Sequence, residues 1–303
     1  FGSTRRGIAY AYGDKYMKKT LRMGDLLELD APSVQHRLKV IIDSKNLVLE
    51  NVYNQEPLSY DEIMEWCRSQ AEFFKDYICD VGTLLGAAAG QGKNILFEAQ
   101  LGALRDIDYG IYPFTSSSNT IASYAPIGAG IPGCALDNVV GVMKAYSTCV
   151  GEGPFVAETA MGEAWNEKLR ESGGEFGAAT GRPRRVGPFD AVASRYGIRC
   201  QKAQDIALTK LDVLGAFDKI PVITGYRLHG VLLDSFPTDS RLEEAEPVIE
   251  ELPGWECDIS GCRSWKDLPE NARKYVCTLE KLVDHPIYLV STGAERDAYL
   301  LRE

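Results

Sequence analysis

The sequence predicts an α/β fold in which helices flank a mainly parallel central sheet. Helical and strand patterns alternate along the chain, and stretches rich in Gly and Pro separate them. We expect helices near residues 136–146, 189–196 and 269–283, and strands at 205–209, 220–228 and 287–290. With 303 residues, of which 45% are hydrophobic, the chain can bury a sizeable core.

The first strong helical pattern follows Ser59. Ser59 and Glu62 have the spacing of a capping box, and apolar residues then recur every three or four positions. We therefore expect one long amphipathic helix that runs to about residue 89 and is ended by the Gly-rich residues 90–92. A short buried strand should follow at 94–98.

The segment GAAAGQGK at 86–93 only partly resembles a phosphate-binding loop. Its Gly-Lys pair lies one residue too far from the first Gly, and no Ser or Thr follows. A phosphate-binding loop leads from a strand into a helix, whereas this segment leads from a helix into a predicted strand. We interpret it as the C-terminal end of the helix.

The charge and cysteine content narrow the class of protein. A formal net charge of -10 disfavours binding to nucleic acid and to anionic membranes, and no stretch approaches the roughly 20 apolar residues of a membrane span. The eight cysteines are scattered without C-x-x-C pairs, which indicates reduced thiols. We expect a cytoplasmic protein. The chain begins without Met and without a signal peptide, so we also expect a region upstream.

Gly and Pro concentrate in two stretches, 102–133 and 151–187. We expect both to be long loops without regular elements. Long ordered loops in an α/β protein usually carry the binding or catalytic site, so these two stretches are the first places to look for it.

A second indication of a binding site follows the predicted strand at 205–209. That strand leads into T-K-L-D at 209–212, which resembles the guanine-specificity element of GTPases. An Asp carboxylate can accept hydrogen bonds from guanine N1–H and the 2-amino group, which adenine lacks, while the Lys stem covers the base. The later strand ends in S-T-G at 291–293, a small turn that can bring backbone amides to the other edge of the base. The alternative is that Lys210 and Asp212 form an ordinary surface pair.

Residues 180–185, T-G-R-P-R-R, place three guanidinium groups in one loop. Arg binds carboxylates and phosphates with two parallel hydrogen bonds, and alternate positions can face two different anions. The run could instead be a solvated patch that pairs with surface Glu residues. Because the loop is short and stiffened by Pro, a binding role is favoured.

Taken together and in this order, the motifs resemble those of the adenylosuccinate synthetase family, over almost the whole chain. The segments that carry the resemblance are 2–8, 106–113 with 117–120, 150–155, 180–185 and 209–212. The resemblance implies a sheet like that of the P-loop NTPases with long functional loops. It also implies a single domain, 1–303, that amounts to the C-terminal three quarters of a family member. Within it, 1–93 would be helical and 94–303 would hold the sheet and substrate loops.

The family's reaction supplies the expected activity. GTP phosphorylates the 6-oxygen of IMP, and the amino group of L-aspartate then displaces phosphate to give adenylosuccinate, a step of AMP biosynthesis. Phosphorylation is needed because an amide-like oxygen leaves poorly, and Mg²⁺ with cationic groups stabilises the developing charge. The expected partners are IMP, L-aspartate, GTP and a second copy of the chain, with neither nucleic acid nor membrane.

The resemblance also assigns residues to each ligand. The IMP site would contain Thr4, Lys18, Gln100, Ser116 and Arg182. The loop that closes on aspartate would contain Ala178, Ala179, Thr180, Gly181, Arg182 and Arg184. The GTP site would contain Arg184, Lys210, Leu211, Asp212, Ser291, Thr292 and Gly293. Lys18 would reach the neighbouring active site of a homodimer, from a position where the family has Arg.

Three further positions depart from the family's pattern. Tyr109 replaces a His, Ala179 replaces a Thr, and Leu101 rather than Gln100 takes the position of a Gln when the segments are aligned without gaps. These departures leave open a relative that uses another amine or another nucleotide. A second alternative is a paralogue that binds nucleotide without catalysis.

The family's phosphate-binding loop, its catalytic Asp base and its His acid precede the matching region. We therefore expect no catalytic residue and no metal ligand within this chain, the Mg²⁺ ligands to lie upstream, and the chain alone to be inactive. His36, His229 and His285 lie in a helical pattern and in two turns, where surface positions are expected.

Overall fold

The computed structural model describes residues 6–177 and 181–302 and divides into two compact units. The helical unit comprises Arg5–Phe97 and Pro126–Gly133. The sheet unit comprises Glu98–Ala125 and Cys134–Glu303. Within the described residues, no helix is both long and apolar enough to cross a membrane.

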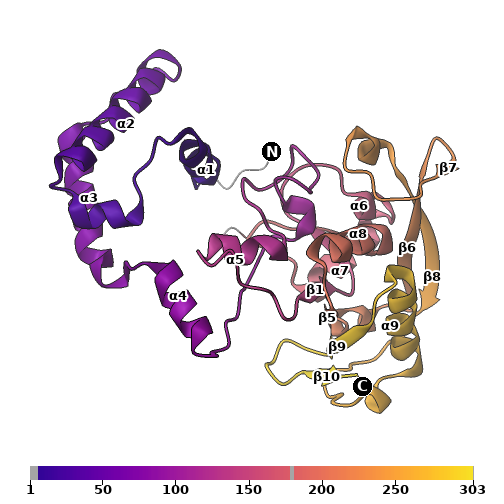
Figure 1. Cartoon of the computed structure of the whole chain (residues 1–303). Helices are drawn as coiled ribbons and strands as arrows, with labels where there is room; N and C mark the ends of the chain where they lie inside the picture. Colours follow the sequence, from indigo (N-terminus) through magenta and orange to yellow (C-terminus); the bar gives the residue numbers. More distant parts are fainter. Residues whose placement is uncertain (1–5, 178–180, 303) are drawn as a thin grey trace. The chain divides into compact units, whose positions relative to one another are not determined.

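The helical unit contains four main helices, labelled in Figure 1, of which α2 and α3 bury a small apolar core. These helices are α1 (Ile8–Met17), α2 (Pro32–Asn51), α3 (Tyr60–Phe74) and α4 (Val81–Gly90). Apolar side chains of α2 and α3 recur at helical spacing and pack together with Leu29, and the buried set is Leu29, Val34, Leu38, Ile42, Met64 and Cys67. As predicted, Ser59 caps α3 by accepting from the backbone N–H of Glu62 at 3.4 Å.

The prediction of a single helix to residue 89 is wrong, because the helix is interrupted. α3 ends at Phe74, the short helix η2 (Lys75–Tyr77) follows, and Asp80 caps a new helix by accepting from the N–H of Thr83 at 3.0 Å. The apolar spacing continues across this break, so periodicity alone did not reveal it. The end of α4 at Gly90 confirms that GAAAGQGK is a helix terminus.

The predicted strand at 94–98 is also wrong. The structure has no strand at these residues, and the side chain of Leu96 is 94% exposed. A short apolar run forms a strand only where a neighbouring strand and a core receive it. Here neither covers the run.

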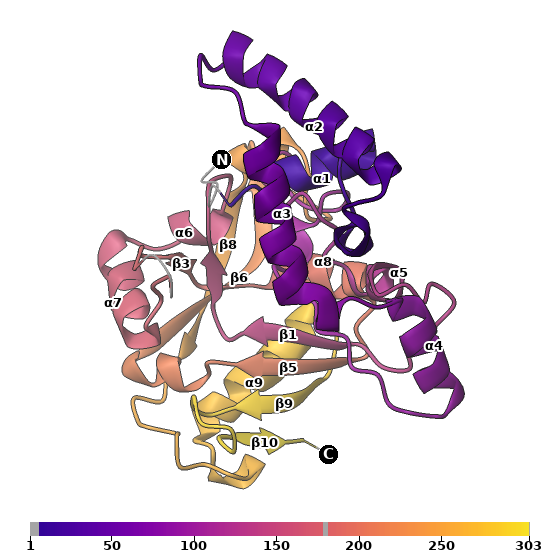
Figure 2. The same cartoon turned by 90° about the vertical axis from the view of Figure 1, so that its left-hand side faces the viewer.

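The main sheet of the second unit has the order β1-β5-β9-β10, and Figure 2 shows these four strands side by side. They are β1 (Val140–Lys144), β5 (Asp205–Thr209), β9 (Ile287–Ser291) and β10 (Tyr299–Leu301). The first three run parallel and β10 is antiparallel. The predicted α/β fold with a mainly parallel central sheet is therefore confirmed.

The helix expected near 136–146 is wrong, because this segment contains β1. Val140 pairs with Asp205 and Val142 with Ala207 in a parallel register. β-branched residues suit a strand, and pairing with β5 outweighs the helical spacing of the apolar residues.

A second sheet and two short strands complete the β structure. β4 (Phe189–Asp190) runs parallel to the long strand β6 (Lys219–Leu228), while β7 (Val231–Leu232) and β8 (Glu246–Pro253) pair with β6 in antiparallel fashion. β2 (Ser147–Cys149) and β3 (Arg185–Gly187) form a separate antiparallel pair. The predicted strand at 220–228 is confirmed. His229 and Gly230 form the expected turn between β6 and β7.

Four helices flank these strands: α6 (Val156–Thr159), α7 (Glu163–Gly173), α8 (Ala191–Gln201) and α9 (Glu270–Val283). α9 matches its prediction, and α8 begins after Asp190, which caps it. α7 contradicts the prediction that 151–187 lacks regular elements. Its buried face includes Leu169, but glycines flank it and most of its residues are polar, which concealed it.

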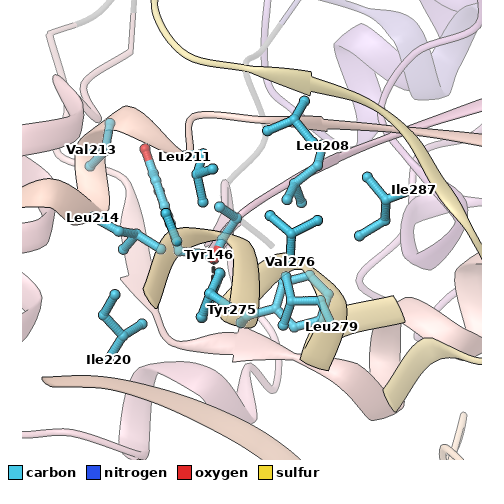
Figure 3. Close-up of a cluster of buried hydrophobic side chains, with 14 of the residues drawn as sticks. Tyr146, Leu208, Leu211, Val213, Leu214, Ile220, Tyr275, Val276, Leu279 and Ile287 are labelled. Carbon is cyan, nitrogen blue, oxygen red and sulfur yellow. Dashed lines mark hydrogen bonds between the residues drawn. The ribbon is translucent and has the colours of Figure 1, made fainter. Parts of the chain in front are cut away.

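The main core lies where α9 packs on the parallel sheet (Figure 3). Tyr275, Val276 and Leu279 of α9 meet Leu208 of β5 and Ile287 of β9, and all five are nearly inaccessible to solvent. The Tyr275 hydroxyl donates to the carbonyl of Ala145 at 2.6 Å, just after β1. This core therefore fixes the ends of the strands from which the candidate site is built.

Removing part of this core should destabilise the fold. Leu208→Ala deletes a fully buried side chain from β5 and should lower the free energy of unfolding by about 2–5 kcal/mol in urea denaturation. Leu232→Ala, at an exposed position of β7, is the matched control and should change it by less than about 0.5 kcal/mol. Equal losses for the two variants would contradict this description of the core.

Candidate functional site

The parallel sheet brings together two of the segments singled out in the sequence. β5 ends at Thr209 and continues into Lys210–Asp212, and β9 ends at Ser291 and continues into Thr292–Gly293. β5 and β9 are parallel neighbours, so both segments leave the same edge of the sheet. Ligands of open α/β sheets bind outside the carboxyl ends of the strands, and this edge is therefore the candidate site.

The segment after β5 combines a fixed backbone with a partly buried acid. Lys210 has a left-handed backbone conformation with φ of 64°, and its Nζ donates to the carbonyl of Gly173 at 2.8 Å. Leu211 is fully buried, which anchors the segment. Burial raises the pKa of Asp212, Asp258 raises it further, and backbone hydrogen bonds and Lys210 oppose the rise. Among the described residues, no salt bridge neutralises Asp212.

The turn after β9 is held rigidly. Thr292 is fully buried, its N–H donates to the carbonyl of Ala298 at 2.8 Å, and its hydroxyl donates to the carbonyl of Cys262 at 3.2 Å. The hydroxyl of Ser291 donates to the carbonyl of Gly293 at 2.9 Å. A Cβ at Gly293 would lie 3.2 Å from the Cβ of Ala298, so the close approach of these backbones favours Gly.

In the arginine-rich loop, residues 182–184 form one side of a hairpin and residues 175–177 form the other side. The N–H of Arg184 donates to the carbonyl of Glu175 at 2.9 Å, Phe176 pairs with Pro183, and the N–H of Gly177 donates to the carbonyl of Arg182 at 2.8 Å. Ala178, Ala179 and Thr180, which were assigned to the aspartate loop, lie outside the described residues. Of that loop, the structure therefore describes Gly181 to Arg184.

Of the three arginines of this loop, Arg182 is exposed, whereas Arg184 and Arg185 are partly buried and paired with acids. The side chain of Arg184 donates to Glu175 at 2.7 Å, and its Nε is buried without a partner among the described residues. Arg185 forms a salt bridge with Glu158 at 2.6 Å and donates to the carbonyls of Gly151 and Gly153. Both side chains are about two-thirds buried, so the alternative of a solvated patch does not describe them.

Sequence reasoning missed Glu175, which the structure places at the centre of this region. Its side chain is 1% exposed and accepts from Lys144 Nζ at 2.7 Å, Tyr146 hydroxyl at 2.6 Å and Arg184 Nη1 at 2.7 Å. Burial alone would raise the pKa of Glu175, but these three hydrogen bonds outweigh it, and the pKa lies below its usual value. Nothing in the sequence distinguishes Glu175 from the other Glu residues. We call Glu175, Lys144, Tyr146 and Arg184 the Glu175 cluster.

Positive charge exceeds negative charge around this cluster. Burial lowers the pKa of Lys144, Glu175 raises it, and the charges of Arg184 and Lys210 lower it further. Arg184 and Lys210 therefore both lie close enough to Lys144 to repel it, while Glu175 pairs with Lys144 and Arg184. Such a group of cations beside a partly buried Asp can receive a polyanion that carries a polar base.

The loop that follows residue 105 is organised by a buried acid. Asp106 is fully buried and accepts from the backbone N–H groups of Asp108 at 2.9 Å, Tyr109 at 3.1 Å and Thr120 at 2.5 Å. Ser116, in the middle of the loop, shares a hydrogen bond with the hydroxyl of Ser118 at 3.0 Å. Asp106 thus closes 106–120 into a defined loop.

Arg105 connects this loop to the next one. Its guanidinium donates to the carbonyls of Phe114, Val150 and Glu152 and to the thiol of Cys149. Arg185 reaches the carbonyls of Gly151 and Gly153 in the same stretch. Loop 106–120, loop 149–153 and the arginine-rich hairpin are therefore joined by two arginines.

The remaining predicted residues are placed as follows. Gln100 is exposed, and the next residue, Leu101, has a left-handed backbone with φ of 73°. Lys18 lies in the other unit, where it ends α1 with φ of 61°. Thr4 lies outside the described residues.

A metal site is not formed by the part of the chain that the structure describes. No group of three or more His, Cys, Asp or Glu residues there is arranged to hold an ion. His36, on α2, His229, in a turn, and His285, which contacts the carbonyl of Gln204, all occupy separate parts of the chain.

Comparisons with known proteins agree on one family. The family model described as adenylosuccinate synthetase matches residues 1–300. The adenylosuccinate synthetase of Trichlorobacter lovleyi is 46% identical over 99% of this chain and 69% of its own length, and that of Pelobacter propionicus is 44% identical with the same coverage. The structure of fully ligated adenylosuccinate synthetase from Plasmodium falciparum matches with a TM-score of 0.91 and 32% identity, over 100% of this chain and 70% of that one.

The partly buried Asp212 should make stability depend on pH. Because burial raises its pKa in the folded state, the folded protein binds this proton more tightly than the unfolded chain, and stability falls as pH rises through the folded pKa. Asp212→Asn should therefore increase the free energy of unfolding at pH 7, and the gain should vanish near pH 4.

Urea denaturation at pH 7, 5 and 4 measures this difference. Asp239→Asn is the control of opposite sign, because the pKa of exposed Asp239 is lowered by hydrogen bonds from Arg241. Asp239→Asn should not increase the free energy of unfolding at pH 7. Destabilisation by Asp212→Asn at pH 7 would show that burial does not disfavour this carboxylate.

Proposed function

Because the chain belongs to the adenylosuccinate synthetase family, we propose that the protein joins IMP to L-aspartate and converts GTP to GDP and phosphate. The 6-oxygen of IMP is a poor leaving group. Transfer of the γ-phosphoryl group of GTP to this oxygen turns it into a phosphate ester, and the aspartate amine then forms the C–N bond as the C–O bond breaks. The product is adenylosuccinate, an intermediate of purine biosynthesis.

The main support for this proposal is that the segments after β5 and β9 lie at the same edge of the sheet. Asp212 would accept from N1–H and the 2-amino group of guanine, and the stem of Lys210 would cover the base. The absence of a salt bridge to Asp212 among the described residues leaves its carboxylate available for the base. Leu211 and the turn Ser291–Gly293 would complete the guanine site.

The arginine-rich hairpin would bind the acidic groups. Arg184 is at the base of the hairpin and would face the GTP phosphates, while Arg182 would face IMP and aspartate. Aspartate carries two carboxylates, which suits a loop with several guanidinium groups. The loop 178–184 would close on aspartate.

The IMP site would use loop 106–120 and a second subunit. Ser116 lies in the loop that Asp106 organises, and Gln100 precedes it. Thr4 would hold the IMP phosphate with Ser116. Lys18 would reach the IMP site of the other subunit, so the protein would act as a homodimer.

We propose Mg²⁺ as the ion that accompanies GTP. Mg²⁺ prefers a set of oxygen ligands, and the described residues form no such set. We therefore assign it no protein ligand in this part of the chain and route no step through it. All eight cysteines are free, which fits a cytoplasmic enzyme.

The test is product analysis with the complete purified enzyme. Incubation with IMP, L-aspartate, GTP and Mg²⁺ should yield adenylosuccinate, GDP and phosphate in equal amounts, measured by liquid chromatography with mass detection. A product formed only from another amine or another nucleotide would contradict the proposed substrates, and would point to Tyr109, Leu101 and Ala179. Binding of GTP without turnover under all these conditions would contradict the proposed reaction.

Asp212 should determine the choice of base. Asp212→Asn loses a charge-assisted acceptor for guanine, so KM for GTP should rise about 10- to 100-fold, equivalent to roughly 1.5–3 kcal/mol. Xanthosine triphosphate has a carbonyl in place of the 2-amino group, so the Asn amide should bind it better than Asp does. Initial rates with GTP and with xanthosine triphosphate measure this change of preference, and Asp239→Asn is the control. An unchanged KM for GTP would show that Asp212 does not bind the guanine base.

A further inference from the structure

Among the described residues, Glu175 is one of the few buried acidic side chains, and it joins the end of β1 to the arginine-rich hairpin. One carboxylate oxygen accepts from Lys144, at the end of β1, and from Tyr146. The other oxygen accepts from Arg184, across the base of the hairpin. Burying a carboxylate costs several kcal/mol unless hydrogen bonds satisfy it, and here both oxygens are satisfied.

Arg184 is held at both its backbone and its side chain. Its N–H donates to the carbonyl of Glu175 at 2.9 Å, and its carbonyl accepts from Nε of Arg170 at 3.0 Å. Its guanidinium then bonds to the carboxylate of the same Glu175. The direction of the guanidinium is therefore set by one residue that is itself almost inaccessible to solvent.

Glu175 also permits three cations to share this edge of the sheet. Burial lowers the pKa of Lys144, and the positive charges of Arg184 and Lys210 lower it further, so both cations repel Lys144. Glu175 offsets part of that repulsion, and the group keeps excess positive charge. About a third of the Arg184 side chain and a quarter of the Lys144 side chain remain exposed and can meet an anionic ligand.

We propose that Glu175 is a positioning residue that aims Arg184 and Lys144 at the phosphates of the nucleotide and does not itself touch a substrate. This role rests on the proposed function. It goes beyond the residues assigned there, because neither Glu175 nor Lys144 was among them.

A merely structural role would predict a different result. If Glu175 served only to stabilise the fold, its replacement would lower stability and the fraction of active enzyme, and KM for GTP would stay the same. A positioning role acts through Arg184 and Lys144, so it changes KM for GTP and leaves KM for IMP nearly unchanged. The ratio of the two KM values therefore separates the two roles.

Glu175→Gln is the first variant to measure in the complete enzyme. The amide has a similar shape but presents N–H groups to Arg184 or Lys144 in place of an acceptor. We expect KM for GTP to rise by about tenfold or more, KM for IMP to change by less than about twofold, and kcat to fall. Glu175→Asp keeps the charge and should recover part of the loss.

Two further variants complete the experiment: one is a matched control, and the other tests whether Glu175 acts through Arg184. Glu163→Gln removes a carboxylate that is exposed and lies 3.5 Å from Arg170, and it should leave all kinetic constants unchanged. Arg184→Ala removes one of the two residues through which Glu175 acts. The double variant with Glu175→Gln should then raise KM for GTP by less than the product of the two single effects, because part of the Glu175 effect passes through Arg184.

The outcomes separate the two proposals. If the wild-type enzyme forms no adenylosuccinate, the proposed function fails. If it does, and Glu175→Gln has an unchanged KM for GTP or a loss that adds fully to that of Arg184→Ala, only the positioning role fails. Should Glu175→Gln not fold, Glu175→Asp decides: its shorter side chain must raise KM for GTP at least a few-fold, and an unchanged value overturns the role.

Discussion

The candidate site depends on the burial of one carboxylate. Glu175 loses its contact with water, and hydrogen bonds from Lys144, Tyr146 and Arg184 offset the cost of that burial. Because two of these donors come from the end of β1 and the residues just after it and the third comes from the hairpin, their common acceptor joins these two segments. The same Ala145 accepts from Tyr275 of α9, so the core and the Glu175 cluster share one junction.

Buried acids organise two other parts of the sheet unit in the same way. Asp106 accepts three backbone N–H groups and closes loop 106–120. Asp190 caps α8 and also accepts from Tyr226, and burial raises its pKa to about 6. Each acid replaces water with fixed donors, which holds long loops rigidly without regular secondary structure. Loops held in this way can keep functional side chains in fixed positions at the edge of a parallel sheet.

The sequence predicts correctly those elements whose own residue pattern identifies them. The apolar runs of β5 and β9, the spacing of α9 and the T-K-L-D segment after β5 carry their own pattern, and the family resemblance is confirmed over almost the whole chain. β1 was taken for a helix because its identity comes from pairing with β5, far along the chain. Glu175 could not be found, because its role depends on partners 9 to 31 residues away. The roles assigned to Lys18 and to residues 178–180 stay predictions.

The proposed reaction requires GTP to activate the 6-oxygen of IMP before aspartate attacks. The direct measurement uses IMP labelled with ¹⁸O at position 6, together with GTP and aspartate, and follows the label by mass spectrometry of the inorganic phosphate. Activation by phosphoryl transfer requires the C6–O bond to break, so the label should appear in phosphate in the same amount as adenylosuccinate is formed. Unlabelled phosphate alongside adenylosuccinate would contradict the mechanism.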